Sequence, residues 1–185
     1  MIPEITEDAE HRMAKAVEAA QHDFATLRTG RANPVILEGI QVDYYGAKLP
    51  INQLAGISSP EPRLLVVTPW DKGAISAIEK AIMSSDVGLT PRSDGNVVRL
   101  QVPYLTEERR KELTKVLHKK AEDHRVAVRN IRRDANERLK ELEKKHEISE
   151  DEERRAQEQV QKLTDRYIEK VDDLAQAKEI ELMEV

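Results

Sequence analysis

Apolar residues recur every three or four positions in two parts of the chain, before residue 30 and after residue 106. This spacing places them on one face of an α-helix. It predicts a first helix before Gly30, a second from Thr106 to beyond Leu142, and a third that starts at Ser149. The three apolar stripes contain Ile5, Ala9, Met13, Ala16, Ala20, Phe24 and Leu27; Leu113, Leu117, Ala121, His124, Val128, Ile131, Ala135, Leu139 and Leu142; and Ala156, Val160, Leu163, Tyr167, Val171 and Leu174. Three helices that are each apolar on one face predict a long three-helix bundle.

Capping residues mark the expected ends of these helices. Thr106 has the hydroxyl of a helix N-cap, and two glutamates follow it at the positive end of the helix dipole. Ser149 and Glu152 have the spacing of a capping box. Gly30 is a candidate C-terminal cap for the first helix, and Pro34 prevents that helix from continuing.

Glycine and proline are concentrated in the middle of the chain. All seven Gly lie between Gly30 and Gly95, and seven of the eight Pro lie between Pro34 and Pro103. The middle therefore predicts a separate module inserted into a helical body. Its expected elements are an alternating strand over 40–45 with a turn at Gly46, a strand buried on both faces over 63–68, a helix over 74–83 that Asp71 starts, and a strand over 96–102.

The predicted fold class is α+β, with a small β/α/β domain inserted into the bundle. We assign residues 1–30 and 105–185 to the bundle and residues 31–104 to the insert. The chain crosses between these parts twice, so the joint permits a hinge but not free tumbling. The candidate hinge residues are Gly30, whose backbone is permissive, Pro34 and Pro103, whose rings stiffen the chain, and Thr106.

Composition favours long exposed helices, because charged residues make up 35% of the chain and aromatic residues 3%. The net charge of −5 conceals a basic segment: residues 107–145 hold 14 basic and 9 acidic residues, whereas 146–185 hold 6 and 13. Binding of a polyanion depends on the local field, so the acidic average does not exclude it. The chain has no Cys, no apolar N-terminal signal and no apolar run of membrane length, which predicts a cytoplasmic protein.

Catalytic chemistry is not indicated. The five His, which are His11, His22, His118, His124 and His146, lack metal-ligand spacing, and there is no phosphate-binding loop of the Walker type. We therefore expect no enzyme, no cofactor and no metal. His124 is interpreted as a core histidine, and the acidic run 147–153 as a helix start. Trp70, Tyr44 and Tyr45 are interpreted as packing residues of the insert, with stacking on nucleic-acid bases as the alternative.

The second helix carries a line of arginines beside its apolar stripe. At about 100° per residue, Arg125, Arg129, Arg132 and Asn136 fall on one line, and Arg133 lies on its flank. Guanidinium groups are planar, permanently charged and suited to phosphate, so RNA is a candidate partner. The alternative is a solvated face with local ion pairs. Spacing alone leaves both open.

Six short motifs stand in order along the chain. They are Arg-Thr-Gly-Arg-Ala (28–32), Tyr-Tyr-Gly (44–46), Glu-Lys-Ala-Ile (79–82), Leu-Thr-Glu-Glu-Arg-Arg-Lys-Glu-Leu (105–113), Val-Ala-Val-Arg-Asn-Ile-Arg-Arg-Asp-Ala-Asn (126–136) and Glu-Ile-Ser-Glu-Asp (147–151). Each is modest alone, but together they cover essentially the whole chain. In this combination the sequence resembles the bacterial ribosome recycling factor family.

The resemblance implies an L-shaped molecule, a three-helix bundle that binds RNA and a smaller domain on a hinge. It implies a monomer that acts on the ribosome after termination with elongation factor G, whose GTP hydrolysis drives separation of the subunits and release from mRNA. The bundle is expected to contact ribosomal RNA of the large subunit near the peptidyl-transferase region. The matching motifs carry over Arg28, Arg31, Arg129, Arg132 and Arg133 as the expected RNA contacts. Arg125 lies outside these motifs and is added because it falls on the helical line. The alternative is a helical scaffold or chaperone that binds protein without RNA.

Overall fold

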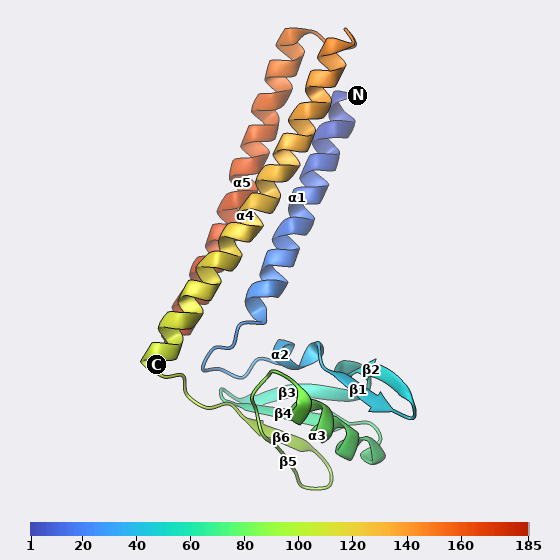
Figure 1. Ribbon diagram of the computed structural model, residues 1–185, viewed down its shortest axis with the longest axis vertical. Coiled ribbons are helices and arrows are strands. Elements are labelled where there is room, and N and C mark those ends of the chain that lie inside the picture. The colour runs from blue at the N-terminus through green and yellow to red at the C-terminus, as the bar shows by residue number, and fades with distance from the viewer. Residues whose placement is uncertain (185) are drawn as a thin grey trace. The chain divides into compact units, whose positions relative to one another are not determined.

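Three long helices run side by side in the computed structural model, which describes residues 1–184 (Figure 1). They are α1 (Ile2–Ala25), α4 (Glu107–Lys144) and α5 (Glu150–Met183). The three helices supply the first of two units, formed by Met1–Phe24 and Lys111–Glu181. The expected helical bundle is therefore present.

The second unit comprises Ala25–Arg110 together with the residues from Leu182 onward, and it contains strands β1 to β6. It is larger than the predicted insert by residues 25–30 on one side and 105–110 on the other. The chain is thus a helical body with a small α/β unit formed by its middle, which is the predicted α+β class. The predicted domain boundaries themselves stay a prediction.

The apolar stripes predicted from the sequence form the bundle core. Its buried cluster contains Ile5, Ala9, Met13, Val128, Ile131, Ala135, Leu139, Ala156, Val160 and Tyr167. On α5 the buried face differs from the predicted stripe, because Thr164 and Ala175 are buried whereas Leu163 and Leu174 are only half-buried. The contact face of α5 is therefore displaced by one position at these two points.

Both predicted N-caps are confirmed. The Thr106 hydroxyl accepts a hydrogen bond from the backbone N–H of Arg109 at 3.1 Å, at the start of α4. Ser149 and Glu152 form the reciprocal capping box of α5, with bonds of 2.7 and 3.1 Å. The first helix ends at Ala25, so the prediction that Gly30 caps it is wrong. Gly30 also lies outside the left-handed region that a glycine cap adopts.

The second unit is built on a four-stranded antiparallel sheet in the order β3-β4-β6-β5, joined by a two-stranded hairpin (Figure 1). Its elements are α2 (Val35–Glu38), β1 (Gln41–Tyr44), β2 (Ala47–Pro50), the 3-10 helix η1 (Ile51–Gln53), β3 (Ala55–Glu61), β4 (Leu64–Pro69), the 3-10 helix η2 (Lys72–Ala74), α3 (Ile75–Ser84), β5 (Pro91–Ser93) and β6 (Val98–Gln101). Helix α3 packs against β1 and β5. The core joins Ile78 and Ile82 of α3 to Leu65, Val67 and Leu100 of the sheet.

The predicted elements of the insert are present, and six others were not predicted from the sequence. The turn at Gly46 is confirmed: Tyr45 and Gly46 both have positive φ, 49° and 81°, as the two central residues of a tight hairpin require. The prediction that β4 is buried on both faces is wrong. Leu65 and Val67 are fully buried, while Leu64 and Val66 on the other face are only half-buried. Strands β2, β3 and β5 and the short helices α2, η1 and η2 went unpredicted.

Candidate nucleic-acid interface

Four of the predicted RNA-binding arginines lie on α4 within the bundle unit. We call Arg125, Arg129, Arg132 and Arg133 the arginine face. The side chains of Arg125 and Arg129 are 27% and 39% exposed, and Arg133 is exposed. The helix exposes these residues because Val128, Ile131 and Ala135 turn inward to the core. The predicted separation of an apolar stripe from a basic face is therefore observed.

Carboxylates hold the first two arginines of this face. Arg125 donates from Nε to Asp172 of α5 at 2.6 Å and from Nη1 to Glu122 at 3.1 Å. Arg129 donates from Nη1 to the other oxygen of Glu122 at 2.8 Å. Hydrogen bonds from Arg129 and Arg125 lower the pKa of Glu122, and the bond to Asp172 raises the pKa of Arg125. Glu122 and Arg125 therefore remain charged at neutral pH.

Arg132 has a neutral partner instead. Its Nη1 donates to the side-chain oxygen of Gln161 on α5 at 2.8 Å, and the Gln161 amide donates to Asp165 at 2.8 Å. The Nε of Arg132 and the Oδ1 of Asn136 are buried without a hydrogen-bond partner among the described residues. The stem of Arg132 is thus fixed in place, whereas no carboxylate within residues 1–184 contacts its charge directly.

This arrangement can bind phosphate. A guanidinium has five N–H donors in a fixed fork, and one hydrogen bond to a protein acceptor leaves others that can point outward. Arg132 and Arg133 carry charge at the face, while Arg125 and Arg129 share theirs with Glu122. Both alternatives left open by the spacing are therefore present: a basic surface, and local ion pairs within it.

The remaining two predicted RNA contacts, Arg28 and Arg31, belong to the second unit. Burial lowers the pKa of Arg28, and the positive charge of Arg109 lowers it further. Arg31 is exposed and pairs with Glu184 at 2.5 Å between Nη2 and Oε2. These two arginines therefore belong to a different unit from the arginine face.

The candidate hinge residues differ in how firmly their neighbours are held. The Ala32 N–H donates to the Pro62 carbonyl at 2.6 Å, and the Val102 N–H donates to the Arg63 carbonyl at 2.8 Å. The chain is thus fixed to the β3–β4 turn at both crossings. Gly30 precedes the first anchor and Pro103 and Thr106 follow the second, whereas Pro34 lies inside the anchored part, at the start of α2.

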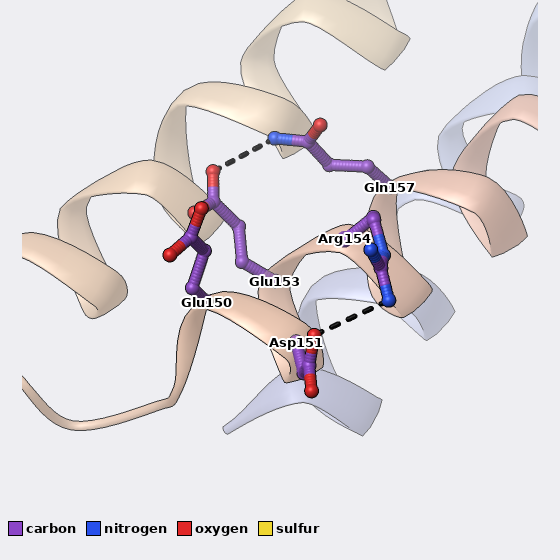
Figure 2. A pocket seen from close by; sticks show the side chains of 5 residues that line it. All are labelled: Glu150, Asp151, Glu153, Arg154 and Gln157. Atoms are coloured by element: carbon purple, nitrogen blue, oxygen red, sulfur yellow. Dashed lines mark hydrogen bonds and ion pairs between the residues drawn. The ribbon is translucent and has the colours of Figure 1, made fainter.

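The other candidate sites give less evidence of ligand binding than the arginine face. A surface pocket at the start of α5 is lined by Glu150, Asp151, Glu153, Arg154 and Gln157. In Figure 2, Arg154 pairs with Asp151, and Gln157 donates to Glu153, so side chains of the same helix satisfy these carboxylates. Among residues 1–184, no group of three or more His, Cys, Asp or Glu side chains is arranged to hold a metal ion. Within the same part of the chain, no helix has the length and apolarity to cross a membrane.

The histidine and aromatic predictions have different outcomes. His124 is a partly buried histidine whose Nε2 lies 2.8 Å from the Asp23 carboxylate, and its ring meets that of Phe24 edge-on, which confirms it as a packed residue. The prediction that Trp70 and Tyr45 pack inside the insert is wrong, since their side chains are 72% and 87% exposed. Trp70 follows the last core position of β4, and Tyr45 sits at the tip of a hairpin, so neither can turn inward.

Sequence reasoning missed the residues that orient the arginines. Glu122 stands three positions before Arg125, a spacing typical of helical ion pairs, so the sequence contained a signal for it. Asp172 and Gln161 carried none, because their contacts depend on how α5 packs against α4.

Comparisons with known proteins agree with this architecture. The chain matches the sequence model of the family described as ribosome recycling factor over residues 20–183. It is 62% identical to the ribosome-recycling factor of Natranaerobius thermophilus over 178 residues, which covers 96% of this chain and 97% of that protein. It is 59% identical to that of Carboxydothermus hydrogenoformans and 56% identical to that of Bacillus subtilis, each over the full length of both chains.

Solved structures give the same result. The chain is similar to a solution structure of a ribosome recycling factor, with a TM-score of 0.79 and 50% identity over 100% of this chain and 98% of that one. It is also similar to a T. thermophilus ribosome recycling factor placed, with E. coli elongation factor G, on the E. coli post-termination complex. That match has a TM-score of 0.70 and 47% identity and covers both chains completely.

Proposed function

Because the chain belongs to the ribosome recycling factor family, we propose that it binds the post-termination ribosome and, with elongation factor G, separates the ribosomal subunits and releases them from mRNA. The observation that carries this proposal is likeness over the whole chain: relatives 59% identical over their full length bear the name of the factor. Similarity of this extent covers both units. It favours recycling over the alternative of a scaffold that binds protein without RNA.

The chemical reaction, GTP hydrolysis, takes place on the partner protein and not on this chain. Elongation factor G hydrolyses GTP, and the chain contributes binding and position without catalysing a reaction. It acts as a monomer in the cytoplasm, where its ribosomal substrate is found. A related factor and elongation factor G have both been placed on the post-termination complex, which supports this pairing.

For the contact with RNA we propose the arginine face of α4. Its support is local charge: residues 107–145 carry a net charge of +5, although the whole chain carries −5. Arg132 and Arg133 add charge at an exposed helical surface, where phosphates of a folded RNA can reach them. Arg28 and Arg31 are proposed as further contacts, and Gly30, Pro34, Pro103 and Thr106 as the hinge. Of these four, Gly30, Pro103 and Thr106 lie outside the anchors at Ala32 and Val102.

The test is subunit separation. Bacterial ribosomes carrying mRNA and deacylated tRNA are mixed with the purified chain, elongation factor G and GTP, and light scattering follows the fall in particle mass. We expect rapid loss of scattering that requires the chain, the factor and GTP together. Scattering that falls equally without the chain, or that never falls, would contradict the proposed function.

A further inference from the structure

Two carboxylates stand at the arginine face, beside the groups proposed to bind phosphate. Glu122 accepts hydrogen bonds from Arg125 at 3.1 Å and from Arg129 at 2.8 Å. Asp172 accepts from Arg125 at 2.6 Å. Their side chains are 52% and 48% exposed, so an approaching polyanion meets both negative charges. A surface that served only to attract RNA would bind it more tightly without these two carboxylates.

The two carboxylates differ in what they join. Asp172 belongs to α5, so its bond to Arg125 links two helices of the bundle. The bonds of Glu122 stay within α4, where Arg125 is three positions away and Arg129 seven. Exposed pairs within one helix contribute little to stability. The main effect of Glu122 is therefore electrostatic, since it places a negative charge against two guanidinium groups at once.

We propose that Glu122 is a specificity-determining residue of the arginine face, which occupies donors of Arg125 and Arg129 until correctly placed RNA phosphates replace it. This inference rests on the function proposed above. A phosphate that reaches Arg129 alone gains one guanidinium and is repelled by the carboxylate beside it. An RNA surface whose phosphates also engage Arg132 and Arg133 gains additional contacts that outweigh this repulsion. Glu122 thereby disfavours binding to RNA that lacks the matching arrangement.

The state of Glu122 fits this role. Hydrogen bonds from Arg129 and Arg125 lower its pKa, so it carries its charge throughout the neutral range. The arginines are equally unable to lose theirs. Competition at this position is consequently between two anions, the carboxylate and the phosphate, for the same donors.

The experiment compares two neutralised glutamates. Glu122→Gln removes the charge and keeps the size and hydrogen-bonding capacity of the side chain. Glu141→Gln is the matched control, because Glu141 is an exposed residue of α4 about 28 Å further along the helix and its loss changes the net charge equally. Equilibrium binding of each full-length variant is measured to a generic RNA duplex and to purified large ribosomal subunits.

We expect Glu122→Gln to raise affinity for the duplex about three- to tenfold above both the wild type and Glu141→Gln, the size of a unit charge acting over about 4 Å in a water-like dielectric. Affinity for the subunit should rise less than about twofold, so that the ratio of specific to generic binding falls. Glu122→Ala repeats the test without the amide, and far-UV circular dichroism verifies that each variant is folded.

The variant Arg129→Ala distinguishes failure of the proposed role of Glu122 from failure of the proposed RNA binding by the arginine face. If it weakens binding to the subunit while Glu122→Gln behaves like Glu141→Gln, the arginine face binds RNA and the role of Glu122 is refuted. If Arg129→Ala and Glu122→Gln both leave binding unchanged, the face does not bind RNA and its proposed function is refuted as well. A subunit affinity that rises as much as the duplex affinity would also overturn the role in specificity.

Discussion

Replacing Arg132 with Ala separates binding from stability more cleanly than other changes on the arginine face. The variant loses one hydrogen bond from the charged guanidinium to Gln161, which contributes about 1.5–3 kcal/mol. It also removes a buried Nε without a partner, and such a group costs about 1–3 kcal/mol. The two effects oppose each other, and Ala favours helix, so the free energy of unfolding should change by less than about 1 kcal/mol.

Loss of a charge-assisted contact to RNA is larger, on the order of 1–3 kcal/mol, or about five- to 150-fold in affinity. The assay is equilibrium binding to large ribosomal subunits beside a urea melt of the same preparation. Arg132→Lys should restore binding only in part, because an ammonium keeps the charge but loses the fork. Gln161→Ala is the control, because it keeps the charge of Arg132 and removes only the side chain that accepts its hydrogen bond. Normal subunit binding by Arg132→Ala, or a loss explained by unfolding, would refute the reasoning.

Three further predictions concern the bundle and the joint. Burial raises the pKa of Asp23, but hydrogen bonds from Lys120 and His124 outweigh this and hold that pKa below its ordinary value. The stabilisation is therefore present above about pH 4 and is lost as pH falls through the lowered pKa of Asp23. Asp23→Asn should cost about 1–3 kcal/mol at pH 7 and progressively less as pH falls below about 4 in thermal melts, and a cost that stays constant in acid would contradict this. Leu139→Ala empties a fully buried site and should cost about 2–5 kcal/mol in urea unfolding, and a cost below about 1 would mean that the site collapses. A Cβ added at Gly30 would meet no atom within 4 Å, and the backbone there is not left-handed, so Gly30→Val should barely change stability. Its β-branched side chain should stiffen the joint, alter spin-label distances between the units and slow subunit separation, and unchanged distances would count against Gly30 as a hinge.

The parts of the fold that depend on local pattern could be predicted from the sequence. Helical periodicity located α1, α4 and α5, and side-chain chemistry located the caps at Thr106 and Ser149. The turn at Gly46 followed from the same local reasoning. In each case the deciding interaction lies within a few residues along the chain.

Features that depend on packing could not be predicted in this way. Strand β5 forms because it pairs with the edge of β6. Its three residues are too few to show the alternation of apolar and polar positions that marks a strand in the sequence. The end of α1 at Ala25 left Gly30 without the expected capping role. Arg132 finds Gln161 across the bundle, a contact that only the register between α4 and α5 determines. The positions of the arginines were thus predictable, but their partners were not.

The most direct test of the account is the salt dependence of binding to the large subunit. Phosphate contacts release counterions, so each one contributes about 0.7–0.9 to the slope of log affinity against log salt concentration. We predict that Arg129→Ala combined with Arg132→Ala lowers this slope by about 1–2 relative to the wild type. A double variant that binds less tightly but with the wild-type slope, or that binds normally, would contradict the claim that this face holds ribosomal RNA through its phosphates.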